Sequence, residues 1–198
     1  MKGLLIKNLF FQKTGPINLK VNPEECITIS GSSGSGKSLF LRAVTDMDHH
    51  TGLIYLDGIE SMEMPAHQWR KKIGLLPAES YWWFDTVGQH FMFSKVDNFL
   101  ESLGFDKNVL EWKINRMSSG ERQRLAIARL LANNPKALLL DEPTANLDNE
   151  NILRVETIIQ KYQTDNHLPI IWVSHDKAQI QRISSRHFVM KNNRLSEV

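Results

Sequence analysis

The chain has 198 residues, of which 41% are hydrophobic and 23% charged, a composition typical of a folded globular domain and not of a disordered segment. The formal net charge of +2 gives no electrostatic reason to expect a nucleic-acid partner. The single cysteine, Cys26, cannot form an internal disulfide, and no stretch reaches the roughly 18 apolar residues of a membrane span.

Strands and helices alternate along the first part of the chain, which favours an α/β layer architecture. Asp57 followed by Gly58 is a turn signal, so the strand before it should belong to a small antiparallel piece. The elements expected up to Pro77 are strands over 4–11 and 26–30, a helix over 39–44, a strand and turn over 53–60, and a strand over 72–77.

Residues 78 to about 117 have a different character. The stretch from Tyr81 to Phe93 is unusually aromatic. Beyond it, Val96, Phe99, Leu100 and Leu103 follow helical spacing, and Gly104 stands where a helix should stop. We therefore expect a mostly helical insert here.

The α/β pattern resumes after the insert. A serine-rich start and Pro135 past the end bound a long helix. The elements expected in this part are helices over 118–134 and 150–162, strands over 137–141 and 169–176, and a hairpin-like tail over 187–198.

A glycine-rich stretch, GSSGSGKS at residues 31–38, fits the phosphate-loop pattern. Its glycines would let backbone N–H groups close around phosphates, while Lys37 reaches the β- and γ-phosphates and Ser38 binds Mg²⁺. A flexible serine–glycine turn is the alternative, but it would not need the strand before it and the helix after it. The residues expected at the nucleotide are Gly31, Ser32, Ser33, Gly34, Ser35, Gly36, Lys37, Ser38 and Leu39.

Two strands are followed by residues that suit phosphate chemistry. The apolar stretch 137–140 leads into Asp141 and Glu142, at the strand end where open α/β sheets bind ligands. Asp141 would hold the Mg²⁺ shell, and Glu142 would orient or deprotonate a water, although an acidic turn is the simpler reading of the pair. His175 follows another apolar strand and is expected to donate a hydrogen bond to the γ-phosphate.

Residues 117–131, MSSGERQRLAIARLL, offer a second place where an anion would be favoured. Ser118 or Ser119 can cap a helix and Glu121 suits its positive end, so a plain helix start explains them as well. The order of phosphate loop, this signature stretch, LLLDEPTANLD and VSHD nevertheless resembles the ATP-binding cassette (ABC) ATPases over nearly the whole chain.

The resemblance implies a P-loop NTPase core, RecA-like and built on a mainly parallel sheet, with a small antiparallel β part and a helical subdomain. It makes 1–198 a single ABC ATPase domain, with the catalytic core over 1–77 and 118–198 and the helical subdomain over about 78–117. It implies ATP and Mg²⁺ as cofactors. The catalytic residues would be Lys37, Asp141, Glu142 and His175.

In that family two cassettes pair head to tail, and each ATP lies between the phosphate loop of one and the signature of the other. The signature stretch at residues 117–131 would then bind the ATP that a partner copy holds. Carried over by position, Ser118, Ser119 and Gly120 should face the opposing γ-phosphate, and 144–148 should lie along the interface. This chain departs from the pattern at Ser119, Glu121 and Ala145, where the family has glycine, glutamine and serine.

The largest departure is Ala78, where the family places a glutamine that helps to ligate Mg²⁺. Alanine has no ligating atom, so Glu79 is expected to act as the metal ligand in its place. The family also stacks an aromatic residue on adenine, and Phe11 is the first candidate with Phe10 as the second. Both phenylalanines would equally suit the core of a strand.

These features predict the ATPase subunit of a transporter, cytoplasmic and peripheral on the cytoplasmic face of the membrane, which forms a homodimer on ATP binding. It would drive a separate transmembrane permease subunit, and no nucleic acid is expected. Part of the aromatic stretch should stay exposed to receive a helix of that subunit, and the remainder should pack a core. The short chain also faintly resembles small two-component bacterial exporters.

Three other functions remain open at this point. They are a soluble ABC ATPase acting on DNA or ribosomes, an ordinary phosphate-loop kinase, and a regulator that holds ATP without turnover.

Overall fold

A computed structural model describes residues 2–91 and 96–198. Its larger sheet has the order β10-β9-β3-β8-β7-β6, and all its neighbours are parallel except β9 and β10. This confirms the expected mainly parallel core. The strands are β3 (Cys26–Ser30), β6 (Ile73–Leu76), β7 (Ala137–Asp141), β8 (Ile170–Val173), β9 (Arg186–Lys191) and β10 (Arg194–Glu197).

The smaller sheet is antiparallel, with the order β2-β1-β4-β5. Its turn at Asp57 and Gly58 joins the last two strands, as expected for the small antiparallel part. The second strand of the chain was not predicted from the sequence, and it pairs with the first strand along its length. The four are β1 (Leu4–Phe11), β2 (Thr14–Val21), β4 (Thr51–Leu56) and β5 (Ile59–Glu60).

Helices cover the larger sheet on both sides, and its central strands β7 and β8 are buried along their whole lengths. On one side a core of Phe40, Leu41 and Ile29 fills the space between the two sheets. On the other side Leu125 and Trp172 belong to a second core, beneath the two longest helices. The helices are α1 (Lys37–Val44), α2 (Ala66–Lys72), α4 (Ser119–Ala132), α5 (Asn149–Asn166), α6 (Lys177–Ile183) and the 3-10 turn Ser61–Glu63.

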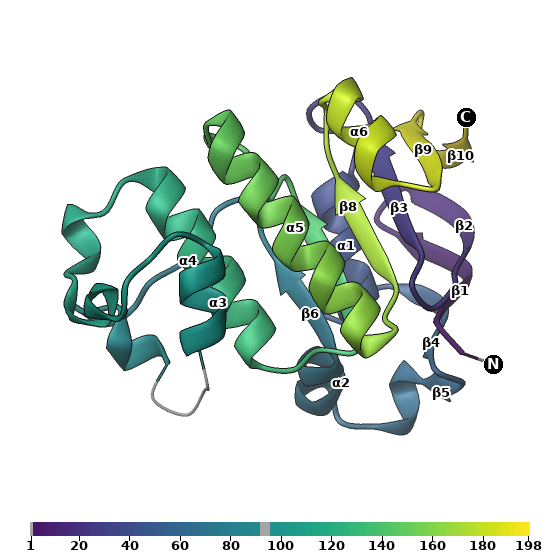
Figure 1. The fold of residues 1–198 in the computed structure, drawn as a ribbon. Coiled ribbons are helices and arrows are strands. Elements are labelled where there is room, and N and C mark those ends of the chain that lie inside the picture. Colours follow the sequence, from purple (N-terminus) through teal and green to yellow (C-terminus); the bar gives the residue numbers. More distant parts are fainter. Residues whose placement is uncertain (1, 92–95) are drawn as a thin grey trace.

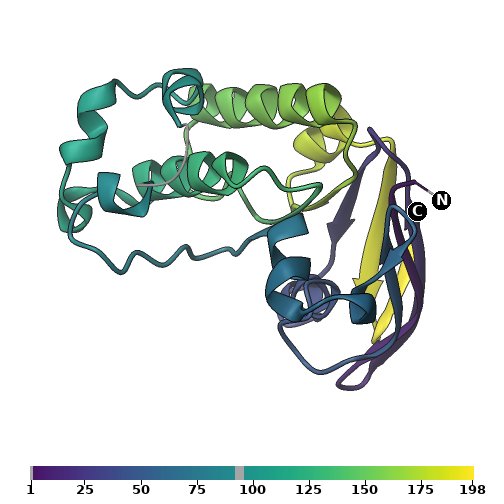
Figure 2. The same ribbon diagram turned by 90° about the horizontal axis from the view of Figure 1, so that it is seen from below.

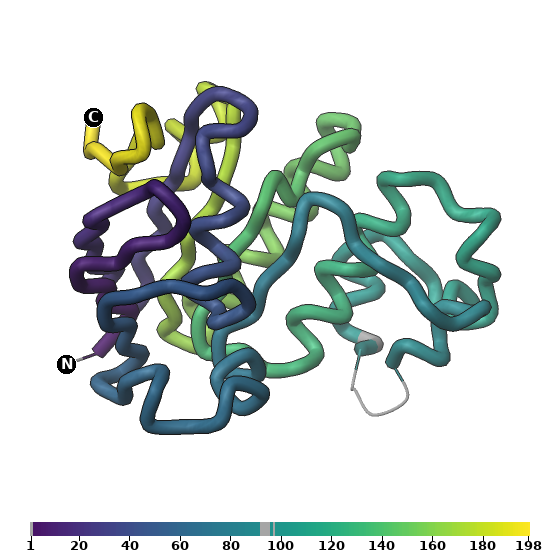
Figure 3. Tube along the Cα trace, turned by 180° about the vertical axis from the view of Figure 1, so that it is seen from behind, coloured from purple at the N-terminus to yellow at the C-terminus, as the bar shows by residue number. Residues whose placement is uncertain are grey.

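Segment 78–117 extends to one side of the sheets, away from both termini (Figures 1 and 3). Figure 2 shows α4 and α5 running from the sheet toward this segment. Among its described residues it contains one α-helix, α3 (Asp97–Ser102), near the position that the apolar spacing indicated, and its other helical pieces are short 3-10 turns, so the described part is less helical than expected. These are the 3-10 turns Gly88–His90, Lys107–Glu111 and Ile114–Arg116.

The strand order fixes where the functional residues meet. β3, β8, β7 and β6 are parallel neighbours, so the residues that follow each of them emerge at one edge of the sheet. Ligands of open α/β sheets bind at this edge. The four loops that begin there carry the glycine-rich stretch, His175, the Asp141–Glu142 pair and Ala78.

Candidate functional site

The glycine-rich loop leaves β3 and enters α1 in a conformation that two glycines make possible. Gly36 caps the helix with φ 101°, and no side chain caps the free N–H groups of the first turn. Gly31 has φ 147°, and a Cβ there would lie 2.3 Å from the backbone oxygen of Met190. The loop therefore presents an uncapped helix start, which is a favourable place for an anion.

Lys37 is buried, with 7% of its surface exposed. Its Nζ donates to the backbone oxygens of Gly31 at 2.8 Å and Ser32 at 3.2 Å. The backbone N–H of Ser35 also donates to the Ser32 oxygen, at 3.1 Å, while the buried Ser35 hydroxyl has no partner among the described residues. The loop therefore fixes the position of the Lys37 ammonium group at the start of α1.

Asp141 ends β7 and is 5% exposed. Burial raises the pKa of its carboxyl above the usual value, and a hydrogen bond with the Ser38 side chain opposes that rise. Two hard oxygen donors, a hydroxyl and a carboxylate, therefore stand together beside the phosphate loop.

Glu142 follows with φ 48°, in the left-handed region that a residue with a side chain seldom adopts. Its backbone N–H donates to the Val173 oxygen at 3.2 Å, which ties the strained residue to β8. His175, from the end of β8, places Nε2 3.1 Å from Oε1 of Glu142. The two side chains are partly open to solvent, with 48% and 37% of their surfaces exposed.

These residues line one cavity of about 250 Å³. The structure thereby brings together five sequence-predicted site residues from three strand ends, together with much of the glycine-rich loop. The lining consists of Ser33, Gly34, Gly36, Lys37, Ser38, Leu39, Ala78, Asp141, Glu142 and His175.

The signature stretch lies elsewhere. Ser118 caps α4 in a capping box, in which its hydroxyl accepts from the Glu121 N–H at 3.2 Å and its own N–H donates to the Glu121 carboxylate at 2.8 Å. Gly120 faces Leu147, since a Cβ there would approach the leucine side chain to 3.1 Å. Ser118, Ser119 and Gly120 are all described, and none of them lines the phosphate-loop cavity.

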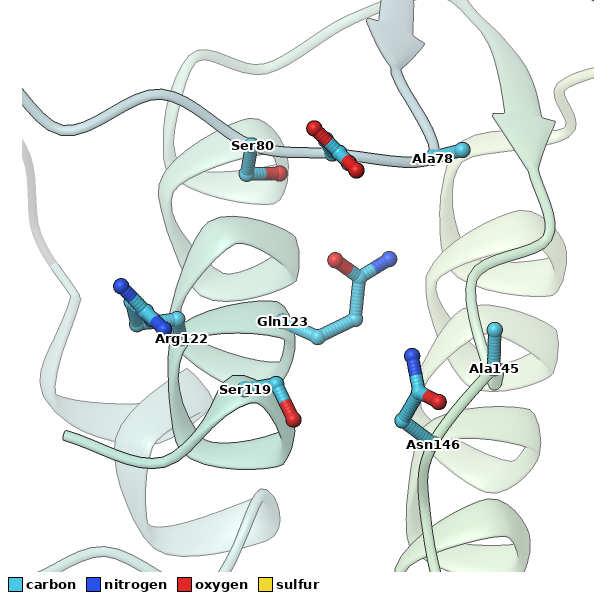
Figure 4. Close-up of a pocket in the computed structure, with 8 residues that line it drawn as sticks. Ala78, Ser80, Ser119, Arg122, Gln123, Ala145 and Asn146 are labelled. Carbon is cyan, nitrogen blue, oxygen red and sulfur yellow. The ribbon is translucent and has the colours of Figure 1, made fainter.

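A second cavity, of about 370 Å³, includes Ser119 of the signature in its lining and no residue of the phosphate loop. It lies between the chain after β6 and the start of α4 (Figure 4). Its lining residues are Ala78, Glu79, Ser80, Ser119, Arg122, Gln123, Ala145 and Asn146.

The second cavity contains Glu79, which the sequence predicts as a metal ligand. Glu79 lines it, whereas the cavity of Ser38 and Asp141 has Ala78 as its wall at this point. Ala78 lines both cavities, whereas Glu79 is absent from the lining that Ser38 and Asp141 share.

The expectation for Phe11 is wrong. Phe11 is 3% exposed, and its ring centroid lies 6.2 Å from that of Phe40 in the core. A ring buried on both faces has no surface to offer to a base. Phe10 is 45% exposed, so it is the phenylalanine of this pair that a ligand can reach.

Gln179 is a residue that the sequence reasoning missed. Its side chain accepts from the Ser174 hydroxyl at 2.8 Å, and its Nε2 donates to Thr144 at 3.0 Å and to Glu156 at 2.8 Å. It therefore connects the loop that carries His175 to the TANLD loop. The sequence around a glutamine in a short polar helix does not indicate such a role.

Comparison with known proteins places this geometry in a family. A family model described as ABC transporter matches residues 14–145. The protein STAR1 of Oryza sativa subsp. japonica is 31% identical over 180 residues, which cover 85% of this chain and 52% of the rice protein. An uncharacterized ABC transporter ATP-binding protein of Methanocaldococcus jannaschii is 30% identical over 200 residues, which cover 90% of this chain and 68% of that protein.

The chain therefore spans about half to two thirds of the length of these curated relatives. Among solved structures, a dimeric ATP-binding cassette in a post-hydrolysis state, bound to ADP and Pi, superposes with a TM-score of 0.85 at 25% identity. The match covers 98% of this chain and 97% of that one. Within the described residues, each helix is too short or too polar to cross a bilayer. The chain belongs to the ABC transporter family and carries the nucleotide-binding domain of that family.

Proposed function

We propose that this chain binds ATP with Mg²⁺, closes over it as a homodimer, hydrolyses it, and thereby drives a membrane-embedded transport subunit. The observation that carries the proposal is the single cavity lined by Lys37, Ser38, Asp141, Glu142 and His175. A cation, two hard oxygen donors, a base and a hydrogen-bond donor are the parts that phosphoryl transfer to water needs.

Binding follows from the phosphate loop. The uncapped start of α1 would accept the negative phosphates, and the Lys37 ammonium would exchange the Gly31 and Ser32 oxygens for phosphate oxygens. The Ser38 hydroxyl and the Asp141 carboxylate suit Mg²⁺, which typically takes one or two protein oxygens and fills its remaining positions with phosphate and water. When bound, the metal would neutralise charge on the β- and γ-phosphates.

Hydrolysis would start at Glu142. Its carboxylate would accept a proton from a water as the water oxygen forms a bond to the γ-phosphorus, and the bond between that phosphorus and the ADP oxygen would break. His175, which now contacts Glu142 at 3.1 Å, would donate a hydrogen bond to the transferred phosphoryl group. The products are ADP and inorganic phosphate.

Dimerisation would complete the site. The start of α4 carries free N–H groups and two serines, yet it does not reach the cavity of its own chain. Facing a second copy head to tail, Ser118 and Gly120 would contact the γ-phosphate that the partner holds, with Ser119 between them. Because that phosphate would link two chains, ATP favours the closed pair and hydrolysis removes the preference.

The membrane partner would dock on segment 78–117. Tyr81, Trp83 and Phe84 are 76%, 65% and 42% exposed, and we call these three residues the aromatic ledge. Phe91 is buried, Trp82 packs against the core, and Phe93 lies outside the described residues. An apolar helix of the membrane subunit on the cytoplasmic side would cover the aromatic ledge.

The same proposal divides the chain into a catalytic core, 1–77 and 118–198, and a coupling subdomain over about 78–117. The core would act on ATP, and the coupling subdomain would report the state of the core to the membrane partner. The position of segment 78–117 to one side of the sheets supports this division (Figure 1).

Phosphate release and mass in solution test the proposal together. The purified chain should release phosphate from ATP only with Mg²⁺ and should approach twice its monomer mass when hydrolysis is blocked. Binding without release would instead identify a regulator, and transfer of phosphate to a small acceptor would identify a kinase. Retention by DNA or ribosomes, with no membrane protein recovered from detergent extracts, would contradict the transport role.

A further inference from the structure

His90 contacts two of the three residues of the aromatic ledge, Trp83 and Phe84. It ends the 3-10 turn Gly88–His90, and its Nε2 lies 3.1 Å from the backbone nitrogens of both Trp83 and Phe84. Its Nδ1 lies 3.0 Å from the backbone oxygen of Thr86. Two N–H donors converge on Nε2, so that nitrogen must be the acceptor, and Nδ1 carries the hydrogen that is donated to Thr86. The contacts fit only one form of the ring, a neutral imidazole of this tautomer.

The same imidazole is surrounded by three consecutive aromatic rings. Its centroid lies 4.8 Å from that of Trp82, 4.9 Å from that of Trp83 and 5.1 Å from that of Phe84, all edge to face. Residues 81–84 have no helix or strand of their own. The conformation of this segment therefore depends on the two hydrogen bonds that His90 accepts and on the packing of its ring against the three aromatic rings.

Arg129 of α4 holds the other side of the aromatic segment. Its Nη2 donates to the Tyr81 oxygen at 3.1 Å, and its guanidinium carbon lies 4.4 Å and 4.9 Å from the ring centroids of Trp82 and Trp83. The described charged group that acts on His90 is this guanidinium. A second positive charge on the imidazole would be repelled by it and would face two N–H donors.

The local electrostatics agree with a neutral ring. Burial lowers the pKa of His90 below the ordinary 6.5, and the Arg129 charge lowers it further, against opposing hydrogen bonds to the Thr86 and Val87 backbone. The ordered ledge thus binds a proton less readily than a released one. The stabilisation that the neutral ring gives to the ledge is therefore fully present above about pH 6.5 and decreases as the pH falls through the lowered pKa of His90.

We propose that neutral His90 is the positioning residue that shapes the aromatic ledge, and that a proton on Nε2 releases the ledge. The identity of the partner that docks on the ledge rests on the proposed function, whereas the ordering of the ledge by His90 depends on this chain alone. The inference adds a control by acidity to the proposed docking surface: the membrane partner would find a formed ledge only while His90 is uncharged.

Amide exchange of Trp83 and Phe84 tests the inference. Their protection factors, which correct for intrinsic exchange, should fall about tenfold in the wild-type chain between about pH 7.5 and pH 5 as two hydrogen bonds are lost. His90→Gln keeps an uncharged acceptor near the Nε2 position, so its protection should not change with pH. His67→Gln, at an exposed histidine, should behave as the wild type does.

Two results would overturn the inference: protection of both amides that does not change with pH in the wild-type chain, or imidazole nitrogen shifts that place the hydrogen on Nε2 at neutral pH. His90→Phe should lose the protection at both pH values, and the His90→Gln arm still decides the matter if that variant fails to fold. Phosphate release by the wild-type chain tests the proposed function separately, because its absence would leave the exchange result intact.

Discussion

The Nε2 atom of His175 lies 3.1 Å from the Oε1 atom of Glu142, across the ends of two adjacent parallel strands. The contact brings a hydrogen-bond donor to the residue proposed as the base. The backbone of Glu142 is held at φ 48°, and its N–H is bonded to the strand that carries the histidine. Strain of this kind is typical of active sites, where the surrounding structure fixes a conformation that the chain would otherwise avoid.

Glu142→Gln should lower phosphate release by about 10²- to 10⁴-fold, because the amide cannot accept a proton from water while it keeps the shape of the carboxylate. ATP binding should persist, since Lys37 and the phosphate loop are untouched, and the ATP-bound dimer should accumulate. Phosphate release and light scattering at saturating ATP measure the two effects. Hydrolysis at the wild-type rate would contradict the role of Glu142, and a lasting monomer would contradict the shared site.

Asp141→Asn should raise the Mg²⁺ concentration needed for half-maximal hydrolysis, because one anionic oxygen of the site becomes a neutral amide. Chelation of the metal should abolish hydrolysis in the wild-type chain. Titration of phosphate release with Mg²⁺ measures both effects.

Glu79→Ala provides the matched control, because it removes a neighbouring carboxylate that lines the other cavity. Its Mg²⁺ titration should overlay that of the wild-type chain. A shift as large as that of Asp141→Asn would show that Glu79 reaches the metal and that the two cavities act as one.

Much of the site could be predicted because its residues follow apolar strands directly. A buried parallel strand reads as an apolar run, and its end marks the ligand edge of the sheet. Asp141, Glu142 and His175 are positioned in this way. The Glu79 side chain could not be placed by the same argument, because Glu79 lies beyond the end of β6 in a stretch without helix or strand, where no strand fixes which cavity a residue lines.

Short elements with polar sequences were harder to predict. β2 contains Gly15 and Pro16 directly after its first residue, Thr14. These residue types usually interrupt strands, and the strand forms because it pairs with β1. α2 is a seven-residue helix rich in basic residues, in which Trp69 alone is buried. Helices of this length are stabilised by tertiary packing and not by their own propensity.

The error at Phe11 has a specific physical cause. Strict alternation from the buried Leu4 and Ile6 would turn Phe10 inward and Phe11 outward. The pairing of β1 with β2 shifts register between Ile6 and Leu9, close to Asn8 with φ 49°. An extra residue at such a bulge exchanges the two faces of the strand, and Phe11 is buried as a result.

Phe10→Ala should weaken ATP binding by about 5- to 150-fold, which corresponds to the loss of one stacked base. Phe11→Ala should instead lower the free energy of unfolding by about 3–5 kcal/mol, as expected for a large ring removed from a core. Leu53→Ala, an exposed apolar residue of the same sheet, serves as the control for both. Nucleotide titration and thermal unfolding separate the two effects, and unchanged ATP affinity in Phe10→Ala would contradict the stacking role.

Cys26 should be unreactive in the folded chain. Its thiol is buried in β3, and burial, followed by the charge of Glu25, raises its pKa from 9.0 to about 12. That shift lowers the thiolate population by about 1000-fold at neutral pH. A thiol reagent at about pH 8 should therefore label the chain only as fast as the chain unfolds. Because there is a single cysteine, the signal has no other source, and the chain in denaturant gives the unprotected rate. Rapid labelling of the native chain would show that β3 opens at its start, where it is hydrogen-bonded between β8 and β9.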